Sequence, residues 1–332
     1  MSVQAIAERV LELSGSFQPA CVLAAGADWD VFTRLHAAPT TADAFAGTLA
    51  TDPRATRVLL DALVALELLT KQEGVYSVPA DVAACLTASA AGSVLPMVLH
   101  RANCMRRWAQ LSTVVQRGGP ADLAPSVRGE AADRAAFIGA MHTVSGPVAN
   151  SLVAAVCPAG LRHVLDVGGA SGTWTMAFLH AAPEARATIF DLPPVIPMAR
   201  QRMLDAGLAE RVTFVPGDFY VDALPAGADA VWLSAIAHQN SREQNRALFA
   251  KAHVALEPRG VLLIRDIVMD GSRTSPTAGA MFAVNMLVGT EAGGTYTFGE
   301  YREDLMAAGF EAIDLVRRSE WMDSVIHARR RA

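Results

Sequence analysis

The sequence VLDVGGASGTW, residues 164–174, decides the fold of this chain. It opens with a short apolar run that ends abruptly in glycine, a pattern typical of a buried strand entering a tight turn. After the turn, apolar residues recur at helical spacing, and Thr173 is the predicted helix cap. Strand, turn and helix together predict a cradle for a nucleotide-type ligand. The turn itself consists only of glycines and small residues, which leave space for a ligand: Gly168, Gly169, Ala170, Ser171 and Gly172.

Two later stretches also read as strands followed by an acid. ATIFD (187–191) ends in Asp191, where an acid usually accepts hydrogen bonds from a ribose diol. The alternative is that Asp191 only caps the next helix. VTFVPGDF (212–219) ends in Asp218 and Phe219, which can accept from an adenine amino group and lie against its ring. NAD and S-adenosylmethionine both fit these features, although the glycines lack the G-x-G-x-x-G spacing.

The second half of the chain alternates strand and helix patterns. This alternation predicts an α/β fold with a doubly wound, Rossmann-like parallel sheet, whose ligands lie outside the carboxyl ends of the strands. Two more strand patterns in 310–330 have no helix between them and predict an antiparallel hairpin at the end of the sheet. The predicted parallel strands are 162–167, 187–191, 211–215, 229–235 and 260–268.

Residues 1–100 predict a separate, mainly helical domain of the winged-helix type. A DNA-reading winged helix needs basic and polar residues on its third helix. The third helix here carries only Arg54 and Arg57 among acidic and aliphatic residues. We therefore expect a dimer interface rather than a nucleic-acid partner. The patterns predict three helices and a hairpin, in the order 24–35, 41–49, 53–69 and 71–78.

Residues 101–160 predict linking helices, with Pro147 expected to kink or interrupt the last of them. The catalytic domain is then predicted at 161–332.

The bulk composition restricts the class of protein. The chain has 332 residues and a net charge of −5, which argues against a nucleic-acid footprint. Its four cysteines have neither metal-site spacing nor the density of a disulfide framework. Charged residues interrupt the first apolar stretch and the apolar run 58–69, so we expect no signal peptide and no membrane span. The expectation is a cytoplasmic protein.

Four motifs, in order along the chain, resemble one known family. They are D-V-G-G-A-S-G, D-L-P, G-D-F and a strand ending in histidine, at 166–172, 191–193, 217–219 and 229–238. Together they resemble the class I S-adenosylmethionine-dependent O-methyltransferases of the plant caffeate and acetylserotonin type, with their bacterial relatives in natural-product pathways. The resemblance covers nearly the whole chain. It implies a class I methyltransferase sheet, in which the antiparallel hairpin at 310–330 is the difference from a dehydrogenase sheet. It also implies a winged-helix dimerisation domain, a homodimer, and S-adenosyl-L-methionine as cofactor, without a metal. The cofactor-binding residues implied are Asp166, Gly168, Gly169, Gly172, Asp191, Leu192, Asp218, Phe219 and Ser234.

His238 is the only histidine at a strand tip of the predicted sheet. A phenol has a pKa near 10, so a histidine base helps to deprotonate it at neutral pH. The family's catalytic base occupies this position, and Asp266 on the next strand matches an acid that orients it. The alternative is a structural histidine packed beneath the cofactor.

The match to the family is incomplete around His238. The family commonly follows the histidine with Asp-Trp, whereas this chain has Gln239-Asn240. A second acid in a G-G-x-E-R-T segment is missing from residues 293–297, so His238 would be oriented by Asp266 alone. Weaker base machinery suits an acidic hydroxyl, a carbon or a nitrogen acceptor. It also suits a relative that uses S-adenosylmethionine for hydroxylation, decarboxylation or cyclisation.

The acceptor pocket is expected between the sheet edge and a helical lid. An apolar, methionine-rich wall suits a flat aromatic or polyketide-type acceptor. Asn285 is the polar exception in its helix and would contact the acceptor hydroxyl, whereas Trp108 is expected to pack rather than to contact the acceptor. A remote alternative is a winged-helix regulator that senses a ligand. The acceptor-contacting residues implied are Met141, His142, Phe282, Asn285 and Met286.

Overall fold

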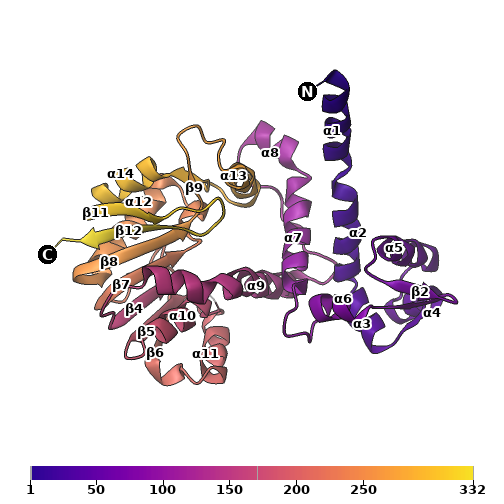
Figure 1. The fold of residues 1–332 in the computed structure, drawn as a ribbon, viewed down its shortest axis with the longest axis horizontal. Coiled ribbons are helices and arrows are strands. Elements are labelled where there is room, and N and C mark those ends of the chain that lie inside the picture. The colour runs from indigo at the N-terminus through magenta and orange to yellow at the C-terminus, as the bar shows by residue number, and fades with distance from the viewer. Residues whose placement is uncertain (1, 170, 332) are drawn as a thin grey trace. The chain divides into compact units, whose positions relative to one another are not determined.

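The computed structural model describes residues 2–169 and 171–331, which form two compact units. The first unit contains the chain up to Arg106 together with Leu123–Thr143. The second contains Arg107–Asp122 and the chain from Val144 onward. The segment 101–160 is therefore divided between the two units. In Figure 1 the colour follows the chain from indigo at the N-terminus to yellow at the C-terminus.

The first unit is mainly helical, as predicted, with a small antiparallel sheet in the order β1–β3–β2. Helix α5 begins at Pro53, and Asp52 caps it by accepting a hydrogen bond from the backbone N–H of Ala55 at 2.8 Å. The elements are α1 (Val3–Gly15), α2 (Phe17–Asp28), α3 (Val31–Ala37), β1 (Thr40–Thr41), α4 (Ala42–Leu49), α5 (Pro53–Ala65), β2 (Thr70–Gln72), β3 (Val75–Ser77), α6 (Ala80–Leu86) and α7 (Leu95–Trp108), which ends in the second unit.

The single helix predicted over 24–35 is wrong, because two helices meet there. Helix α2 ends where the N–H of Trp29 bonds to the carbonyl oxygen of Ala25 at 3.1 Å. Asp30 then adopts a left-handed backbone with φ +54°, which an α-helix does not accommodate, and α3 starts at the next residue. Apolar residues continue on both sides of the break and hide it in the sequence.

Helix α9 (Glu130–Val156) runs through Pro147 without the predicted interruption. Its residues up to Thr143 belong to the first unit and those from Val144 to the second. Proline has no N–H, so the carbonyl of Thr143 receives no helical hydrogen bond from Pro147. The boundary between the two units within α9 therefore lies where one backbone hydrogen bond of the helix is missing.

The second unit is built on a seven-stranded sheet in the order β11–β12–β8–β7–β4–β5–β6 (Figure 1). The pairs from β8 to β6 are parallel, and β12 lies antiparallel between β8 and β11. The predicted methyltransferase-type sheet is confirmed. Its strands are β4 (His163–Val167), β5 (Arg186–Asp191), β6 (Val212–Pro216), β7 (Ala228–Ser234), β8 (Leu256–Asp266), β11 (Phe310–Arg317) and β12 (Ser324–Arg330). A separate parallel pair consists of β9 (Val268–Met269) and β10 (Tyr296–Thr297).

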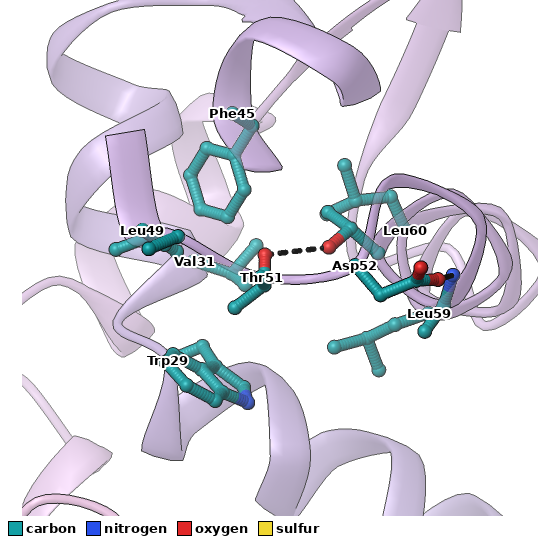
Figure 2. A pocket seen from close by; sticks show the side chains of 11 residues that line it. Trp29, Val31, Phe45, Leu49, Thr51, Asp52, Leu59 and Leu60 are labelled. Carbon is teal, nitrogen blue, oxygen red and sulfur yellow. Dashed lines mark hydrogen bonds between the residues drawn. The ribbon is translucent and has the colours of Figure 1, made fainter. Parts of the chain in front are cut away.

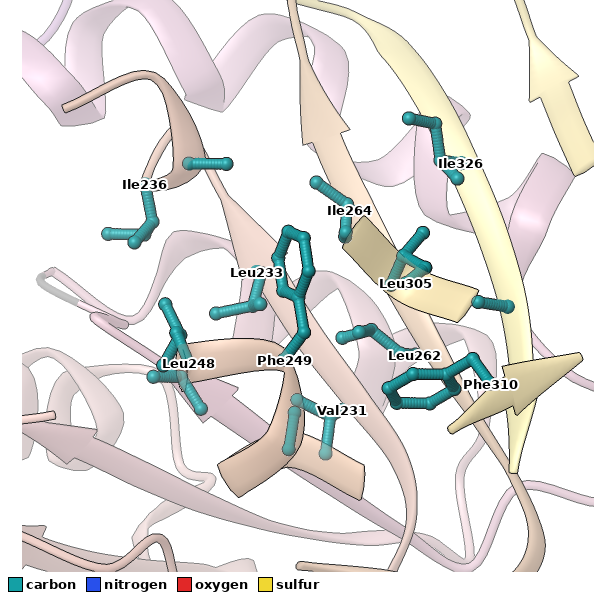
Figure 3. Packing of buried hydrophobic residues seen from close by; sticks show 14 of the residues in the cluster. Val231, Leu233, Ile236, Leu248, Phe249, Leu262, Ile264, Leu305, Phe310 and Ile326 are labelled. Carbon is teal, nitrogen blue, oxygen red and sulfur yellow. The ribbon is translucent and has the colours of Figure 1, made fainter. Parts of the chain in front are cut away.

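Helices cover both faces of this sheet. Side chains along each strand alternate between the faces, so each face has apolar residues that a helix can bury. Val231 and Leu233 of β7 pack with Phe249 of α12 in one core (Figure 3), while Trp232 packs with Phe178 of α10 in the other. The remaining elements of this unit are α8 (Leu111–Arg117), α10 (Thr173–Ala181), α11 (Ile196–Asp205), η1 (Ala209–Arg211), η2 (Ala237–Gln239), α12 (Arg242–Ala255), α13 (Thr277–Gly289) and α14 (Phe298–Ala307).

Candidate active site

The glycine turn between β4 and α10 is held by the sheet and closely packed. The N–H of Gly168 donates to the carbonyl oxygen of Phe190 at 2.8 Å. Gly168 and Gly172 have φ +68° and +74°, which favour glycine. A Cβ at Gly172 would lie 2.3 Å from the terminal methyl group of Met203, so a larger residue would require this side chain to shift. The predicted cap is wrong, because Gly172 is the N-cap and Thr173 is already the first helical residue. Ala170 lies outside the described residues.

Asp166 lies beneath this turn. Its side chain is buried and accepts a hydrogen bond from Thr175 Oγ1 at 2.6 Å. A Cβ on Gly169 would come within 3.0 Å of its carboxyl carbon. Burial raises the pKa of Asp166 to about 7, and the charge of Asp191 adds to the effect. Asp166 therefore supports the turn from its buried side.

Asp191 lies at the end of β5 and does not cap a helix. Helix α11 starts at Ile196, and its N-cap residue is Val195, which makes no side-chain cap bond. The backbone N–H of Leu192 instead donates to Asp191 Oδ1 at 2.7 Å. Leu192 itself is 47% exposed beside the carboxylate. The structure thus rejects the capping alternative and leaves a carboxylate next to an exposed leucine.

The loop after β6 presents Asp218 and Phe219. Asp218 Oδ1 accepts from the N–H of Tyr220 at 2.9 Å, and its own N–H donates to Asp222 at 2.8 Å. Lys251 donates to the carbonyl oxygens of Phe219 and Asp222, both at 2.8 Å. These bonds fix a short loop at the end of the strand next to β5.

Ser234 at the end of β7 is bonded to a buried arginine that the sequence reasoning missed. Arg265 Nη1 donates to Ser234 Oγ at 3.1 Å, and its guanidinium lies 4.5 Å from the Trp174 ring centroid. It also pairs with Asp323 at 2.6 Å. A charged residue inside the apolar run VLLIRDIV was the available signal, since a buried arginine requires partners.

His238 and Asp266 form a buried pair. Nδ1 of His238 lies 2.8 Å from Oδ1 of Asp266, and the backbone N–H of His238 reaches Oδ2 at 3.2 Å. The N–H of Ile267 also donates to Asp266, at 2.8 Å. The edge of the His238 ring meets Phe282, with centroids 4.8 Å apart. Within residues 2–169 and 171–331, Nε2 of His238 has no hydrogen-bond partner.

The segment that lacks the second acid packs on the backbone of the histidine turn. The N–H of Gly294 donates to the carbonyl oxygen of His238 at 2.8 Å. A Cβ at Gly293 would lie 2.6 Å from the same oxygen. The Tyr296 hydroxyl donates to the carbonyl oxygen of Asn240. In the described part of the chain, Asp266 is the only carboxylate paired with the His238 ring.

The predicted acceptor residues fall in both units. In the second unit, Asn285 Oδ1 accepts from the indole N–H of Trp108 at 3.0 Å, and Met286 is buried on the same helix. Trp108 packs against the buried cluster of Val114 and Val288, as expected, and its hydrogen bond to Asn285 is an additional contact that was not predicted. Met141 and His142 lie on the part of α9 that belongs to the first unit, and their contact with an acceptor stays a prediction.

Comparison with known proteins identifies the family. A family model for the O-methyltransferase domain matches residues 124–311, and one for the O-methyltransferase dimerisation domain matches residues 11–89. The chain belongs to the O-methyltransferase family. This family depends on S-adenosylmethionine, and the chain is a methyltransferase.

Several proteins resemble this O-methyltransferase over almost their whole length. The 3-hydroxy-5-methyl-1-naphthoate 3-O-methyltransferase of Streptomyces sahachiroi is 32% identical, covering 89% of this chain and 87% of that protein. The N,N-dimethyltransferase OxyT of Streptomyces rimosus is 30% identical, covering 96% and 94%. The crystal structure of human N-acetylserotonin methyltransferase with S-adenosylmethionine superimposes with a TM-score of 0.80 at 25% identity, covering 98% of each chain.

The dimerisation domain of this O-methyltransferase has an apolar surface on α1. None of the residues of α1 is buried, and Val3, Leu11 and Leu13 are 85%, 70% and 64% exposed. The aliphatic third helix, α5, was the expected interface, but Leu60 and Leu63 are fully buried in the domain's own core. This domain also has a groove of about 380 Å³. Its lining is mainly apolar and includes Trp29, Phe45, Leu49 and Leu59 (Figure 2).

The described residues contain neither a membrane-crossing helix nor a cluster of metal ligands. No helix of this O-methyltransferase in the ranges 2–169 and 171–331 is long and apolar enough to cross a lipid bilayer. In the same ranges, no three His, Cys, Asp or Glu side chains are grouped to hold a metal ion.

Proposed function

We propose that this enzyme transfers the methyl group of S-adenosylmethionine to a hydroxyl of a small aromatic or polyketide-type acceptor, with His238 as general base oriented by Asp266. The observation that carries the proposal is the buried His238–Asp266 pair at the ligand edge of the sheet, with Nε2 of the histidine left without a partner. The naphthoate O-methyltransferase relative supports an aromatic hydroxyl as the acceptor.

The residues at the strand ends fit S-adenosylmethionine. The carboxylate of Asp191 can accept from a ribose diol, and exposed Leu192 beside it offers an apolar surface. Asp218 and Phe219 follow the next strand, where Pro216 pairs with Asp191 in register, and would hold the adenine. The bare backbone of the glycine turn would receive the methionine part. In this proposal Asp166 and Ser234 shape the site from beneath, through Thr175 and Arg265.

The chemistry required of the protein is small, because the bound cofactor supplies a methyl group on a good leaving group. A carboxylate at Asp266 only accepts hydrogen bonds, so Nδ1 of His238 donates to it and Nε2 keeps a free lone pair. Nε2 can then take the phenolic proton, and Asp266 stabilises the imidazolium that forms. Alignment of the acceptor contributes further to the rate.

The acceptor would lie against α13. Phe282 touches the His238 ring, so an aromatic acceptor beside Phe282 is within reach of the base. The amide of Asn285 keeps its NH₂ group for an acceptor oxygen while its carbonyl oxygen is held by Trp108. Met286 lies on the same helix.

The test is turnover by the His238→Ala variant with a panel of phenolic acceptors and mass detection. General-base assistance is worth roughly 10²–10⁴-fold, so turnover should fall by that order. Affinity for S-adenosylhomocysteine should stay nearly unchanged, and Asp266→Asn should cost less than His238→Ala. The matched control is His180→Ala, which removes an exposed histidine from the end of α10 and should keep full turnover. Full turnover in His238→Ala across neutral pH would remove the base assignment.

A second candidate is transfer to nitrogen or carbon, or a reaction that leaves the methyl in place. The missing second acid beside His238 and the similar N,N-dimethyltransferase both favour it. Cofactor with a deuterated methyl group separates the cases. A labelled product that survives His238→Ala indicates a nitrogen or carbon acceptor, and an unlabelled product that still requires the cofactor indicates a non-methylating reaction.

We also infer a homodimer formed through the first unit. The dimerisation-domain match and the exposed apolar residues of α1 support it, since a large apolar surface usually marks an interaction site. Light scattering should give twice the chain mass at micromolar concentration, and Leu11→Asp with Leu13→Asp should lower it. A monomer of the natural chain at that concentration would count against the inference.

A further inference from the structure

A hydrogen bond joins the loop that carries Phe219 to the turn that carries His238. The hydroxyl of Tyr220 donates to Oδ1 of Asn240 at 2.6 Å. Asn240 is fully buried, two residues after His238. The bond therefore crosses between the segments that follow two different strands, β6 and β7.

On the histidine side, the connection continues through a second buried amide. Asn240 Nδ2 donates to Oδ1 of Asn245 at 3.0 Å, and Asn245 Nδ2 donates to the carbonyl oxygen of Ala237 at 2.9 Å. Ala237 directly precedes His238. An amide oxygen only accepts hydrogen bonds and an amide nitrogen only donates them. The bonds therefore determine the orientation of both side-chain amides. A buried polar network with every member bonded is rigid.

On the cofactor side, Tyr220 is attached to both residues proposed to hold the adenine. Its ring lies 4.6 Å from the ring of Phe219, centroid to centroid, and its N–H donates to Asp218. Burial raises the pKa of Tyr220, with a contribution from Asp218. The hydroxyl thus keeps its proton and remains a donor to Asn240.

This connection depends on a residue that departs from the pattern of the resembled family. Asn240 stands where that family commonly has tryptophan. An indole side chain has a donor and no acceptor, so it could not receive the Tyr220 hydroxyl. The hydrogen bond is therefore a property of this chain's own pair of residues.

We propose that the Tyr220–Asn240 hydrogen bond couples S-adenosylmethionine binding at Asp218 and Phe219 to the position of His238. The cofactor's adenine would order Phe219, and with it the Tyr220 ring that packs on Phe219. The ordered hydroxyl then holds Asn240, Asn245 and the backbone before His238. Tyr220 and Asn240 are positioning residues, and the inference rests on the proposed cofactor site and base.

The test is hydrogen–deuterium exchange on the full chain, with and without S-adenosylhomocysteine. In the natural chain the ligand should slow exchange in residues 216–222 and also, by about threefold or more, in residues 235–241. Tyr220→Phe keeps the ring and removes only the donor. It should keep the protection of 216–222 at saturating ligand and lose that of 235–241. Protection of both segments in Tyr220→Phe would overturn the proposal.

Calorimetry supplies a second measurement on the same proteins. Loss of one hydrogen bond should weaken S-adenosylhomocysteine binding about three- to tenfold in Tyr220→Phe. Adding Asn240→Leu should then weaken it no further, because the partner is already gone. Independent, additive losses would count against the coupling.

The matched control is Tyr296→Phe, which removes the other hydroxyl bonded to Asn240, at its backbone oxygen. It has no bond to residues 216–222 in the described structure and should keep the ligand-induced protection of both segments. Neither measurement requires turnover. If His238→Ala kept full turnover, the base assignment would fail while the exchange result would still decide the coupling.

Discussion

Asp166→Asn should change how stability depends on pH. In the folded chain the pKa of Asp166 is raised to about 7 from its ordinary 3.8, chiefly by burial. Between these two values the unfolded chain has lost the proton and the folded chain retains it. Folding therefore takes up a proton, and the free energy of unfolding falls as pH rises through this window.

The size of the effect follows from the two pKa values. Above pH 7 the ionised, buried carboxylate should cost about 4 kcal/mol of stability, and at pH 5 about 2 kcal/mol. Asparagine cannot ionise, and its amide oxygen can still accept from Thr175. The difference in unfolding free energy between Asp166→Asn and the natural chain should therefore shift by about 2–3 kcal/mol in favour of the variant between pH 5 and pH 8.

Urea unfolding at several pH values measures this shift. Trp174 and Trp232 pack 5.2 Å apart in the core beside Asp166's strand, so their fluorescence reports the unfolding of that unit. The control is Asp205→Asn, which removes an exposed carboxylate at the end of α11. Parallel pH curves for Asp166→Asn and the natural chain would refute the reasoning. Any constant offset reflects the amide's extra N–H groups and carries no information on the titration.

Further predictions concern the cofactor, the turn and the acceptor. Asp191→Ala should weaken S-adenosylhomocysteine binding about tenfold or more in calorimetry, because a hydrogen-bonded charge is lost; unchanged affinity would remove Asp191 from the cofactor site. Gly172→Ala should lower the free energy of unfolding by about 2–5 kcal/mol, combining left-handed strain with a clash. Gly160→Ala, at φ +71° in open space, should cost only about 1–2 kcal/mol, and equal losses in both would show that the clash is relieved. Trp108→Phe should raise the KM for the acceptor more than it lowers kcat, since it frees the Asn285 amide; a change in kcat alone would point away from acceptor binding.

The parallel sheet and the positions after its strands were predictable because they depend on local patterns. Apolar runs that end in Gly168, Asp191 and Asp218 mark both a strand and its carboxyl end, and parallel strands bring those ends to one edge. His238 and Asp266 were placed together by the same rule, and the structure shows them bonded.

The features that could not be predicted from the sequence depend on contacts between residues far apart in the chain or on backbone dihedral angles. The break at Asp30 lies inside a continuous apolar pattern, because a positive φ leaves no periodic signal. The Tyr220–Asn240 hydrogen bond joins residues of two different loops. A tyrosine in one loop does not predict an asparagine partner in the other. The hydrogen bond from Trp108 to Asn285 links residues 177 positions apart. The sequence therefore indicated a role for the Asn285 amide but not its partner.

The position of β12 in the sheet leaves one edge of β8 unpaired during synthesis of the chain. Asp266 ends β8, and its partner across the sheet is Ser324, about 60 residues later in the chain. Ribosomes add about 5–20 residues per second, so β8 waits roughly 3–12 s with one side unpaired. That side belongs to an apolar strand containing Val261, Leu262 and Ile264, and an unpaired apolar edge can join another chain. During synthesis the strand that ends in Asp266 is therefore open to pairing with another chain until β12 arrives.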